Sequence, residues 1–416
     1  MNYASSLRYL NSFLNLEQIT YHPKNYLWNL DRMRILLVWF NHPEKSFFPV
    51  LIAGTKGKGS TGFFLESILA ASGIRVGFYS SPHLEDPRER IRLQAKMVSR
   101  SEWVKGIREI QRVLSKRHLD PGHGDFTYFE IMTLLAMLTF QKQRVQVGIF
   151  EVGMGGRLDA TNVLETKLQI LTPIYLDHEA FLGNTVTQIA REKAAIIRPD
   201  ADVVVSPQSP EASKVINLEI RKKKAACLKA SPYKGSLGLA GDYQKINAGA
   251  AVRAAQVLRQ KHGFSISNQA ILKGLKASDW PGRFERFSGR PEYLLDGAHN
   301  PSSIEALTKA LREKYAGRRD RLLIFGTSRD KKSSAMLKTL GSFFDRVILA
   351  PLPTVRSQEM AVLMREAQSN FRFIFPAFNI RHAFRLAKKI AQAKTLVVAT
   401  GSFYLIGEVR KLIRHA

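Results

Sequence analysis

A glycine-rich segment in the first third of the chain has the residue types that bind phosphate. It reads Ala53-Gly54-Thr55-Lys56-Gly57-Lys58-Gly59-Ser60-Thr61, directly after an apolar run and directly before a predicted helix. Glycines let backbone N–H groups turn toward a phosphate chain, and the N-terminus of the following helix adds positive charge. In this pattern Lys58 can reach the terminal phosphates of a nucleotide, and Ser60 or Thr61 can help to hold Mg²⁺.

The match to the standard phosphate-binding loop is incomplete. The first glycine of that pattern would fall at Ile52, and Gly59 separates Lys58 from the hydroxyl residue. A glycine turn of purely structural origin therefore remains an alternative. The apolar run before the segment and the helix after it favour nucleotide binding.

A carboxylate, a histidine and a lysine follow other apolar runs. Glu151 ends one predicted strand, and His178 lies just past another. Open α/β sheets bind ligands at the carboxyl ends of their strands, so both residues would share an edge with the phosphate loop. Glu151 is suited to hold Mg²⁺, although it can equally cap the glycine turn that follows it. A lone histidine is more often structural, and Lys193 on a predicted helix can simply be a surface lysine.

Alternating short apolar runs and amphipathic stretches must position these groups. This alternation is typical of βαβ units around a mostly parallel sheet, so we predict an α/β fold. In a first series the predicted strands cover residues 48–53, 76–79, 145–150 and 201–205, and the predicted helices cover 60–72 and 128–141. In a second series the predicted strands cover 293–295, 322–325, 347–350 and 395–399, and the predicted helices cover 301–315 and a segment after Ser402.

A stretch with a Pro-Gly pair lies between the two series. It reads Asp279-Trp280-Pro281-Gly282-Arg283-Phe284 and is suited to a hinge. We therefore predict two domains, residues 1–287 and residues 288–416.

The composition limits the class of protein but does not fix the function. The chain of 416 residues has 63 Lys and Arg against 35 Asp and Glu, a net charge of +28 that attracts nucleic acid, anionic lipid or anionic small ligands. Hydrophobic residues make up 45%, which is ordinary globular usage. The single cysteine, Cys227, excludes an intramolecular disulfide framework and a multi-cysteine zinc site. No apolar run is long enough to span a bilayer and the N-terminus does not resemble a signal peptide, so we expect a soluble, cytoplasmic protein.

Taken together and in order, the motifs resemble the folylpolyglutamate synthase and dihydrofolate synthase branch of the Mur ligase superfamily. The resemblance begins at the phosphate loop and extends over nearly the whole chain. The other matching segments are residues 79–84, 88–91, 127–130, 151–162, 176–178, 191–194, 280–285, 296–301 and 400–405. Many motifs in the same order are far more specific than any one of them.

The resemblance implies a fold and an activity. The fold would be α/β: a P-loop-containing Mur-ligase central-type domain over residues 1–287, with a mostly parallel sheet and a pterin or folate site, and a smaller Rossmann-like α/β domain over 288–416. The activity would be that of an ATP-dependent amide ligase, which adds L-glutamate to dihydropteroate, to folates or to both through an acyl phosphate. The implied protein is a cytoplasmic monomer that binds neither nucleic acid nor membrane.

The resemblance also implies roles for particular residues. Catalysis would depend on Lys58, Glu151, His178 and Lys193. ATP would contact Thr55, Lys56, Gly57, Lys58, Gly59, Ser60, Asn247, Arg283 and Asp296, so that domain closure would complete its site. Two Mg²⁺ ions would be held by Ser60, Ser81, Glu151, His178 and Lys193. The pterin substrate would lie against Thr127, Tyr128, Phe129, Glu130, Leu158, Asp159 and Ala160.

One of these roles carries a condition, because a lysine cation repels Mg²⁺. Lys193 matches the lysine that the family carbamylates, and a carbamate is an anion able to join the metal site. The chain also departs from the family in places: Lys56 stands where many relatives have asparagine, and residues 21–32, where a loop over the pterin is expected, match weakly.

Three alternatives stay open. Within the class, the enzyme can be restricted to folylpolyglutamate synthesis or can act on a related acidic substrate. A nucleic-acid-associated P-loop ATPase would fit the charge, although the sequence has no recognisable nucleic-acid-binding module. A degenerate ligase that only binds folate or nucleotide is disfavoured, since the four catalytic positions are all occupied by suitable residues.

Overall fold

The computed structural model describes residues 1–17, 29–277 and 280–415, and these form two compact units. The first unit takes residues 1–17, 29–82, 88–238 and 244–277, and the second takes 83–87, 239–243 and 280–415. The predicted domain boundary after residue 287 falls inside the second unit. The assignment of separate functions to residues 1–287 and 288–416 stays a prediction. Most of the predicted loop at 21–32 and the hinge residue Asp279 lie outside the described residues.

The first unit contains an eight-stranded sheet in the order β4-β3-β2-β5-β1-β6-β7-β8. Six neighbouring strands are parallel, and β3 and β4 add an antiparallel edge beside β2. The strands are β1 (Phe48–Ala53), β2 (Val76–Tyr79), β3 (Ile91–Leu93), β4 (Lys96–Met97), β5 (Val147–Glu151), β6 (Leu168–Leu171), β7 (Asp202–Val205) and β8 (Ala226–Lys229).

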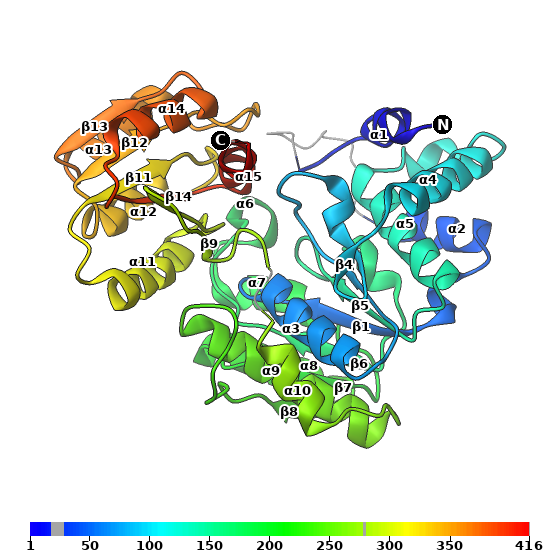
Figure 1. Ribbon diagram of the computed structural model, residues 1–416. Helices are drawn as coiled ribbons and strands as arrows, with labels where there is room; N and C mark the ends of the chain where they lie inside the picture. The colour runs from blue at the N-terminus through cyan, green and yellow to red at the C-terminus, as the bar shows by residue number, and fades with distance from the viewer. Residues whose placement is uncertain (18–28, 278–279, 416) are drawn as a thin grey trace. The chain divides into compact units, whose positions relative to one another are not determined.

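Helices cover both faces of this sheet because the central strands are apolar on both sides. Leu51 and Ala53 belong to a core with α2, α4, α5, α7 and α8, whereas the alternating Val50 and Ile52 are buried on the opposite face. On that opposite face α3, α9 and α10 lie together (Figure 1). The helices are α1 (Tyr3–Asn11), α2 (Asp31–Trp39), α3 (Lys58–Ala71), α4 (Arg100–Leu114), α5 (Tyr128–Lys142), α6 (Glu179–Leu182), α7 (Val186–Ala194), α8 (Pro210–Lys222), α9 (Tyr243–Lys261) and α10 (Asn268–Leu275).

The second unit has a six-stranded sheet in the order β13-β12-β11-β14-β10-β9, parallel except for β9. One core packs α11, α12 and α13 on one face, and another packs α14 and α15 on the other. The strands are β9 (Glu285–Phe287), β10 (Glu292–Leu295), β11 (Arg321–Phe325), β12 (Arg346–Leu349), β13 (Phe373–Pro376) and β14 (Leu396–Thr400). The helices are α11 (Pro301–Tyr315), α12 (Ser333–Gly341), α13 (Met360–Gln368), α14 (Ile380–Ile390) and α15 (Phe403–Arg414).

The two sheets confirm the predicted fold class, a P-loop α/β unit with a mostly parallel sheet and a smaller Rossmann-like α/β unit. The antiparallel edge strands β3, β4 and β9 are short and were not predicted. None of the helices in the described ranges combines the length and the apolar character needed to cross a membrane.

Candidate active site

The predicted site residues of the first unit follow four neighbouring strands. The order β2-β5-β1-β6 is parallel throughout, so the four carboxyl ends lie along one edge of the sheet. Ser81 follows β2, Glu151 ends β5, the phosphate loop follows β1 and His178 comes after β6. The topology therefore brings these residues to one edge, where open α/β sheets bind their ligands.

The phosphate loop contains two glycines with positive φ, Gly54 (147°) and Gly57 (83°). Gly57 has φ 83° and is the N-cap of α3, so the helix begins at Lys58, two residues earlier than predicted. A Cβ on Gly57 would lie 2.0 Å from Oδ1 of Asn247, and one on Gly54 would lie 1.9 Å from Oγ1 of Thr172. Only glycine fits at either position. The first N–H groups of a helix such as α3 have no carbonyl partner within the helix, so they are suited to bind an anion.

Thr55 and Lys56 tie this loop to the segment after β6. Their N–H groups donate to the carbonyl of Pro173 at 3.0 and 3.2 Å. The Thr55 hydroxyl exchanges two hydrogen bonds with the backbone of Tyr175, both at 3.1 Å, and the Lys56 ammonium lies 4.3 Å from the Tyr175 ring centroid. The loop is thus held in shape by the chain itself, and a contact of these two residues with ATP stays a prediction.

A buried polar chain joins α9 to the start of α3. The Asn247 amide donates to Gln244 at 2.9 Å, and the Gln244 amide donates to the Ser60 hydroxyl at 3.4 Å. All three side chains are buried. Gln244 was not predicted from the sequence, although it lies three residues before Asn247, one turn away on the same helix.

Glu151 lies between two other predicted site residues. One of its oxygens is 3.9 Å from the Lys58 ammonium, and the other accepts the Ser81 N–H at 3.3 Å. The alternative role for Glu151, capping the glycine turn after β5, is filled by Asp159, whose carboxylate accepts the Met154 N–H at 3.0 Å. Glu151 is 5% exposed, so its charge acts in a poorly hydrated environment.

Lys193 is not a surface lysine, so that alternative is wrong. It is 4% exposed on α7, and the glycine turn after β5 packs directly against it: a Cβ on Gly156 would lie 3.1 Å from the Lys193 Cα. Burial, and after it the charge of Lys58, lowers the pKa of Lys193 from 10.5 to about 7. A large fraction of Lys193 is therefore a neutral, nucleophilic amine near neutral pH.

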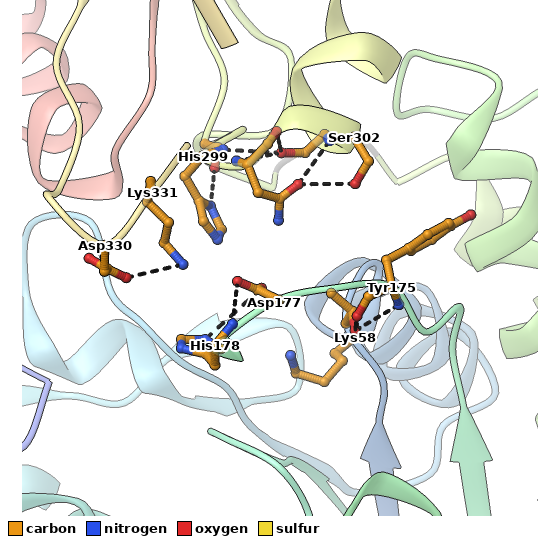
Figure 2. Close-up of polar contacts among 12 residues, drawn as sticks. Lys58, Tyr175, Asp177, His178, His299, Ser302, Asp330 and Lys331 are labelled. Carbon is orange, nitrogen blue, oxygen red and sulfur yellow. Dashed lines mark hydrogen bonds and ion pairs between the residues drawn. The ribbon is translucent and has the colours of Figure 1, made fainter. Parts of the chain in front are cut away.

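His178 lies at the turn that leads into α6. It has a left-handed backbone with φ 51°, its N–H donates to Asp177 at 3.0 Å, and its ring Nε2 is 4.0 Å from the same carboxylate. Figure 2 shows the two side chains next to each other. About a third of the ring is exposed (33%), which leaves it accessible to a ligand.

The donor set at this edge fits a divalent ion that is bound together with a nucleotide. Within the described ranges, no three His, Cys, Asp or Glu side chains gather closely enough to hold a metal by themselves. Mg²⁺ usually takes one or two protein carboxylates and completes its octahedron with phosphate oxygens and water. Glu151, with the hydroxyls of Ser60 and Ser81 at the same edge, matches that requirement.

Two of the predicted pterin residues also have clear structural roles. Thr127 and Glu130 form a capping box at the start of α5, with bonds of 2.8 and 3.2 Å. Glu130 is also paired with Arg32 at 2.9 Å, with both side chains almost fully buried. Burial raises the pKa of Glu130, and Arg32 opposes that rise. These contacts give Thr127 and Glu130 a role in the fold that does not require a bound substrate.

Two of the remaining predicted pterin residues, Phe129 and Asp159, meet at the glycine turn after β5. A Cβ on Gly153 would lie 2.7 Å from the half-buried Phe129 ring and 3.3 Å from an Asp159 oxygen. Tyr128 is buried under the Arg90 guanidinium, which is 5.4 Å from its ring centroid. Leu158 is partly buried and Ala160 is buried next to Asp159. Phe129 and Asp159 are therefore neighbours, as a shared substrate region requires.

Arg283 and Asp296 lie in the second unit. Asp296 is buried and accepts the N–H groups of Phe284 and Ala298 at 2.8 and 2.9 Å, and burial raises its pKa. The Arg283 guanidinium lies 4.5 Å from the Phe403 ring centroid. The neighbouring His299 contacts the Gly297 carbonyl through Nδ1 at 2.8 Å (Figure 2). Asp296 thus joins Phe284, just before β9, to the turn between β10 and α11, and Arg283 lies next to Gly297 of the same turn. Contact of Arg283 and Asp296 with ATP stays a prediction.

The second unit matches a known protein family. The family model described as the Mur ligase glutamate ligase domain matches residues 282–403. With the P-loop unit before it, this match defines the protein as an ATP-dependent ligase of the Mur ligase type.

Full-length relatives narrow the class to one family. The chain is 32% identical over 415 residues to the dihydrofolate synthase/folylpolyglutamate synthase of Bacillus subtilis, covering 92% of this chain and 95% of the relative. A solved Escherichia coli FolC in complex with DHPP and ADP has a TM-score of 0.84 and 29% identity, covering 100% of this chain and 98% of the other. The folylpolyglutamate synthase/dihydrofolate synthase of Yersinia pestis, solved with AMPPNP and a Mn ion, has a TM-score of 0.83 and 28% identity, with the same coverage. The chain belongs to the dihydrofolate synthase/folylpolyglutamate synthase family.

Proposed function

We propose that this protein joins L-glutamate to dihydropteroate and to folates, using one ATP for each amide bond. The observation that carries the proposal is the Lys58–Glu151 pair beside the phosphate loop, in a chain that matches the family over its whole length. The structure of a relative with DHPP and ADP supports a pterin acceptor and an adenine nucleotide. A chain restricted to folylpolyglutamate synthesis is the main alternative.

The reaction must make a carboxylate electrophilic. A carboxylate oxygen of the acceptor attacks the γ-phosphorus of ATP, the bond from phosphorus to the β-bridging oxygen breaks, and ADP leaves. The glutamate amine then attacks the acyl carbon, a C–N bond forms, phosphate leaves with the electrons of the C–O bond, and the amine loses a proton. In this scheme the Lys58 ammonium and the N–H groups of α3 offset negative charge on the transferred phosphoryl group.

The proposed metal ligands are Ser60, Ser81, Glu151, His178 and carbamylated Lys193, for two Mg²⁺ ions. Bound Mg²⁺ supplies charge neutralisation on the phosphates. The Mn ion in the Yersinia pestis structure supports the use of a divalent ion. Glu151 positions the Ser81 backbone through its hydrogen bond, so one carboxylate serves both the metal and its neighbour.

The burial of Lys193 supports its proposed carbamylation. Its neutral amine would attack CO₂, forming a C–N bond and releasing one proton, and would thereby become an anion. The low pKa of the amine supplies the nucleophile at neutral pH. A ¹³C NMR spectrum of protein equilibrated with ¹³C-bicarbonate tests this step. The parent protein should show a carbamate resonance that Lys193→Ala lacks. A parent spectrum without that resonance would contradict carbamylation.

The remaining assignments complete the proposal. Asn247, Arg283 and Asp296 are proposed as nucleotide contacts. Phe129 and Asp159 are proposed as the centre of the pterin region, because the glycine turn holds them together. We propose a monomer that acts in the cytoplasm, with small molecules rather than nucleic acid as partners.

The deciding experiment compares acceptors. Purified protein is incubated with ATP, Mg²⁺ and glutamate, with dihydropteroate, with tetrahydrofolate or with neither. Glutamate-dependent phosphate release with both acceptors is expected, and release with tetrahydrofolate alone would restrict the enzyme to polyglutamylation. Release that depends on glutamate but on neither acceptor would contradict the folate proposal, and release stimulated by RNA or DNA would favour the ATPase alternative.

A further inference from the structure

Arg410 on α15 holds two carboxylates from distant parts of the sequence. Its Nη1 is 2.6 Å from Glu85, and its Nε is 2.9 Å from Glu285. The side chains are 10% exposed for the arginine and 18% for each glutamate. Charge-assisted hydrogen bonds in such a partly dry environment are strong and directional.

Glu85 belongs to a short loop with an unusual position. Residues 83–87 lie between β2 and β3 of the first unit along the chain, yet they pack within the second unit. Leu84 contacts the core beneath α14 and α15. A Cβ on Gly407 would lie 2.2 Å from the Leu84 carbonyl oxygen, so α15 touches the loop backbone directly.

The same loop begins at a proposed metal ligand. Ser81 lies four residues before Glu85, and its N–H donates to Glu151 at 3.3 Å. Four residues span at most about 14 Å, so the position of Glu85 limits where Ser81 can lie. Holding Glu85 therefore restricts Ser81 through the backbone, without any direct contact between Arg410 and the metal site.

We propose that Arg410 is a positioning residue for the metal site: by holding Glu85 it fixes the loop that presents Ser81 to Glu151. The inference rests on the proposed function, in which Ser81 and Glu151 hold Mg²⁺. Removing the guanidinium takes away the cation that Glu85 and Glu285 share, so the loop loses one of its contacts with α15. The metal, rather than the nucleotide alone, should lose affinity.

The test is a calorimetric titration of AMPPNP into each variant, once with excess Mn²⁺ and once with excess EDTA. The ratio of the two dissociation constants measures how far the metal strengthens nucleotide binding, and any effect on the nucleotide alone cancels. We expect this ratio to fall by about 10-fold in Glu85→Gln and in Arg410→Gln, the usual effect of losing a residue that orients a metal ligand. Arg410→Lys, which keeps a cation, should retain most of the ratio.

Glu285→Gln is the matched control. It removes the other carboxylate from the same arginine but leaves the loop attached, so its ratio should equal that of the parent protein. A purely structural role for Arg410 predicts equal losses in Glu85→Gln and Glu285→Gln, and that result would overturn the proposal, as would no loss in Glu85→Gln. Thermal unfolding confirms that each variant is folded, and Glu85→Gln decides the question even where Arg410→Gln does not fold.

Ser81→Ala separates failure of this inference from failure of the proposed function. An unchanged ratio in Ser81→Ala would contradict the metal assignment itself. A reduced ratio in Ser81→Ala together with an unchanged ratio in Glu85→Gln would leave the metal assignment intact and overturn only the role of Arg410.

Discussion

At the residue scale, the charges of Glu151, Lys58 and Lys193 act on one another at the sheet edge. Glu151 lies 3.9 Å from Lys58, and the charge of Lys58 in turn lowers the pKa of Lys193. An anion added at this edge, such as a triphosphate, would relieve the repulsion between the two lysines. A carbamate at Lys193 would convert one of the two cations into a ligand.

Glu151→Ala and Lys193→Ala should each abolish ligation while the protein stays folded. Each removes a proposed metal ligand, and the loss in kcat/KM should be at least about 100-fold, as for other groups that stabilise developing charge. Steady-state kinetics measure the loss, and circular dichroism checks the fold. Full activity in either variant would show that the metal assignment is wrong.

The buried amine of Lys193 should make stability depend on pH. Because its pKa falls from 10.5 to about 7 on folding, the unfolded chain binds more protons than the folded chain between those values. Stability should therefore rise with pH across this window, and the penalty is fully present below pH 7. Lys193→Met removes the penalty.

Chemical unfolding of parent and Lys193→Met proteins in CO₂-free buffer at pH 7.5 and 9.5 measures this effect. The stability advantage of the variant should shrink by about 2 kcal/mol between the two pH values, the product of one proton and the pH difference with allowance for partial titration. The exposed Lys214→Met on α8 serves as the control and should show no such change. An advantage independent of pH would contradict the low pKa of Lys193.

At the element scale, the start of α3 can be tested through its glycine. Gly57→Ala adds a methyl group 2.0 Å from Asn247 at φ 83°, so the phosphate loop must move and ATP affinity should fall at least about 10-fold. Gly73→Ala is the matched control, since Gly73 also has positive φ (77°) but nothing within 4 Å of its Cβ. It should cost about 1 kcal/mol of stability without changing ATP affinity. Equal affinities in both variants would contradict a nucleotide site at this loop.

Glu130 has two possible roles that can be separated by experiment: a contact with the pterin substrate, or stabilisation of the fold through the capping box of α5 and the pair with Arg32. Arg32→Met leaves the buried carboxylate without its partner and should destabilise the protein by about 3 kcal/mol. The double variant Arg32→Met/Glu130→Leu should recover part of this loss. Arg34→Met, which breaks an exposed pair with Asp31 on the same helix, should cost less than about 0.5 kcal/mol.

Urea unfolding measures these differences, and the KM for the folate acceptor separates the two roles. A purely structural Glu130 predicts that Glu130→Gln changes stability but not KM. A rise in KM with unchanged stability would instead support a direct substrate contact.

Strands and helices with a strong apolar pattern were predictable from sequence. The predicted strand at 48–53 and the predicted helix at 301–315 match β1 and α11 at both ends. Helix α9 was not predicted, because half of its buried residues are alanines, which give little contrast with the exposed face. Asn247 was predicted only through the family resemblance, so Gln244 on the same helix was not predicted.

The parts of the site that were not predictable depend on contacts between distant residues. Burial of Lys193, which removes the surface-lysine alternative, comes from a close approach of the Gly156 turn that no local pattern shows. The pairing of Arg410 with Glu85 joins residues 325 positions apart. In contrast, the common edge of Glu151, His178 and the phosphate loop was predictable, since parallel strands align their carboxyl ends.

At the scale of the whole molecule, two α/β units provide residues with separate predicted tasks. The first unit carries the phosphate loop, the metal candidates and the predicted pterin residues, and the second carries Arg283 and Asp296. The net charge of +28 suits substrates that are all anions. Lys56, Lys58 and Lys193 at the candidate site supply only a small part of this excess.

Transfer of an oxygen isotope shows whether the acceptor carboxylate is activated as an acyl phosphate. Dihydropteroate labelled with ¹⁸O in its carboxylate is incubated with the enzyme, ATP, Mg²⁺ and glutamate, and the released phosphate is analysed by mass spectrometry. One ¹⁸O atom should appear in inorganic phosphate for each amide formed, because the attacking carboxylate oxygen stays on phosphorus. Phosphate without ¹⁸O, or label recovered in AMP, would contradict it.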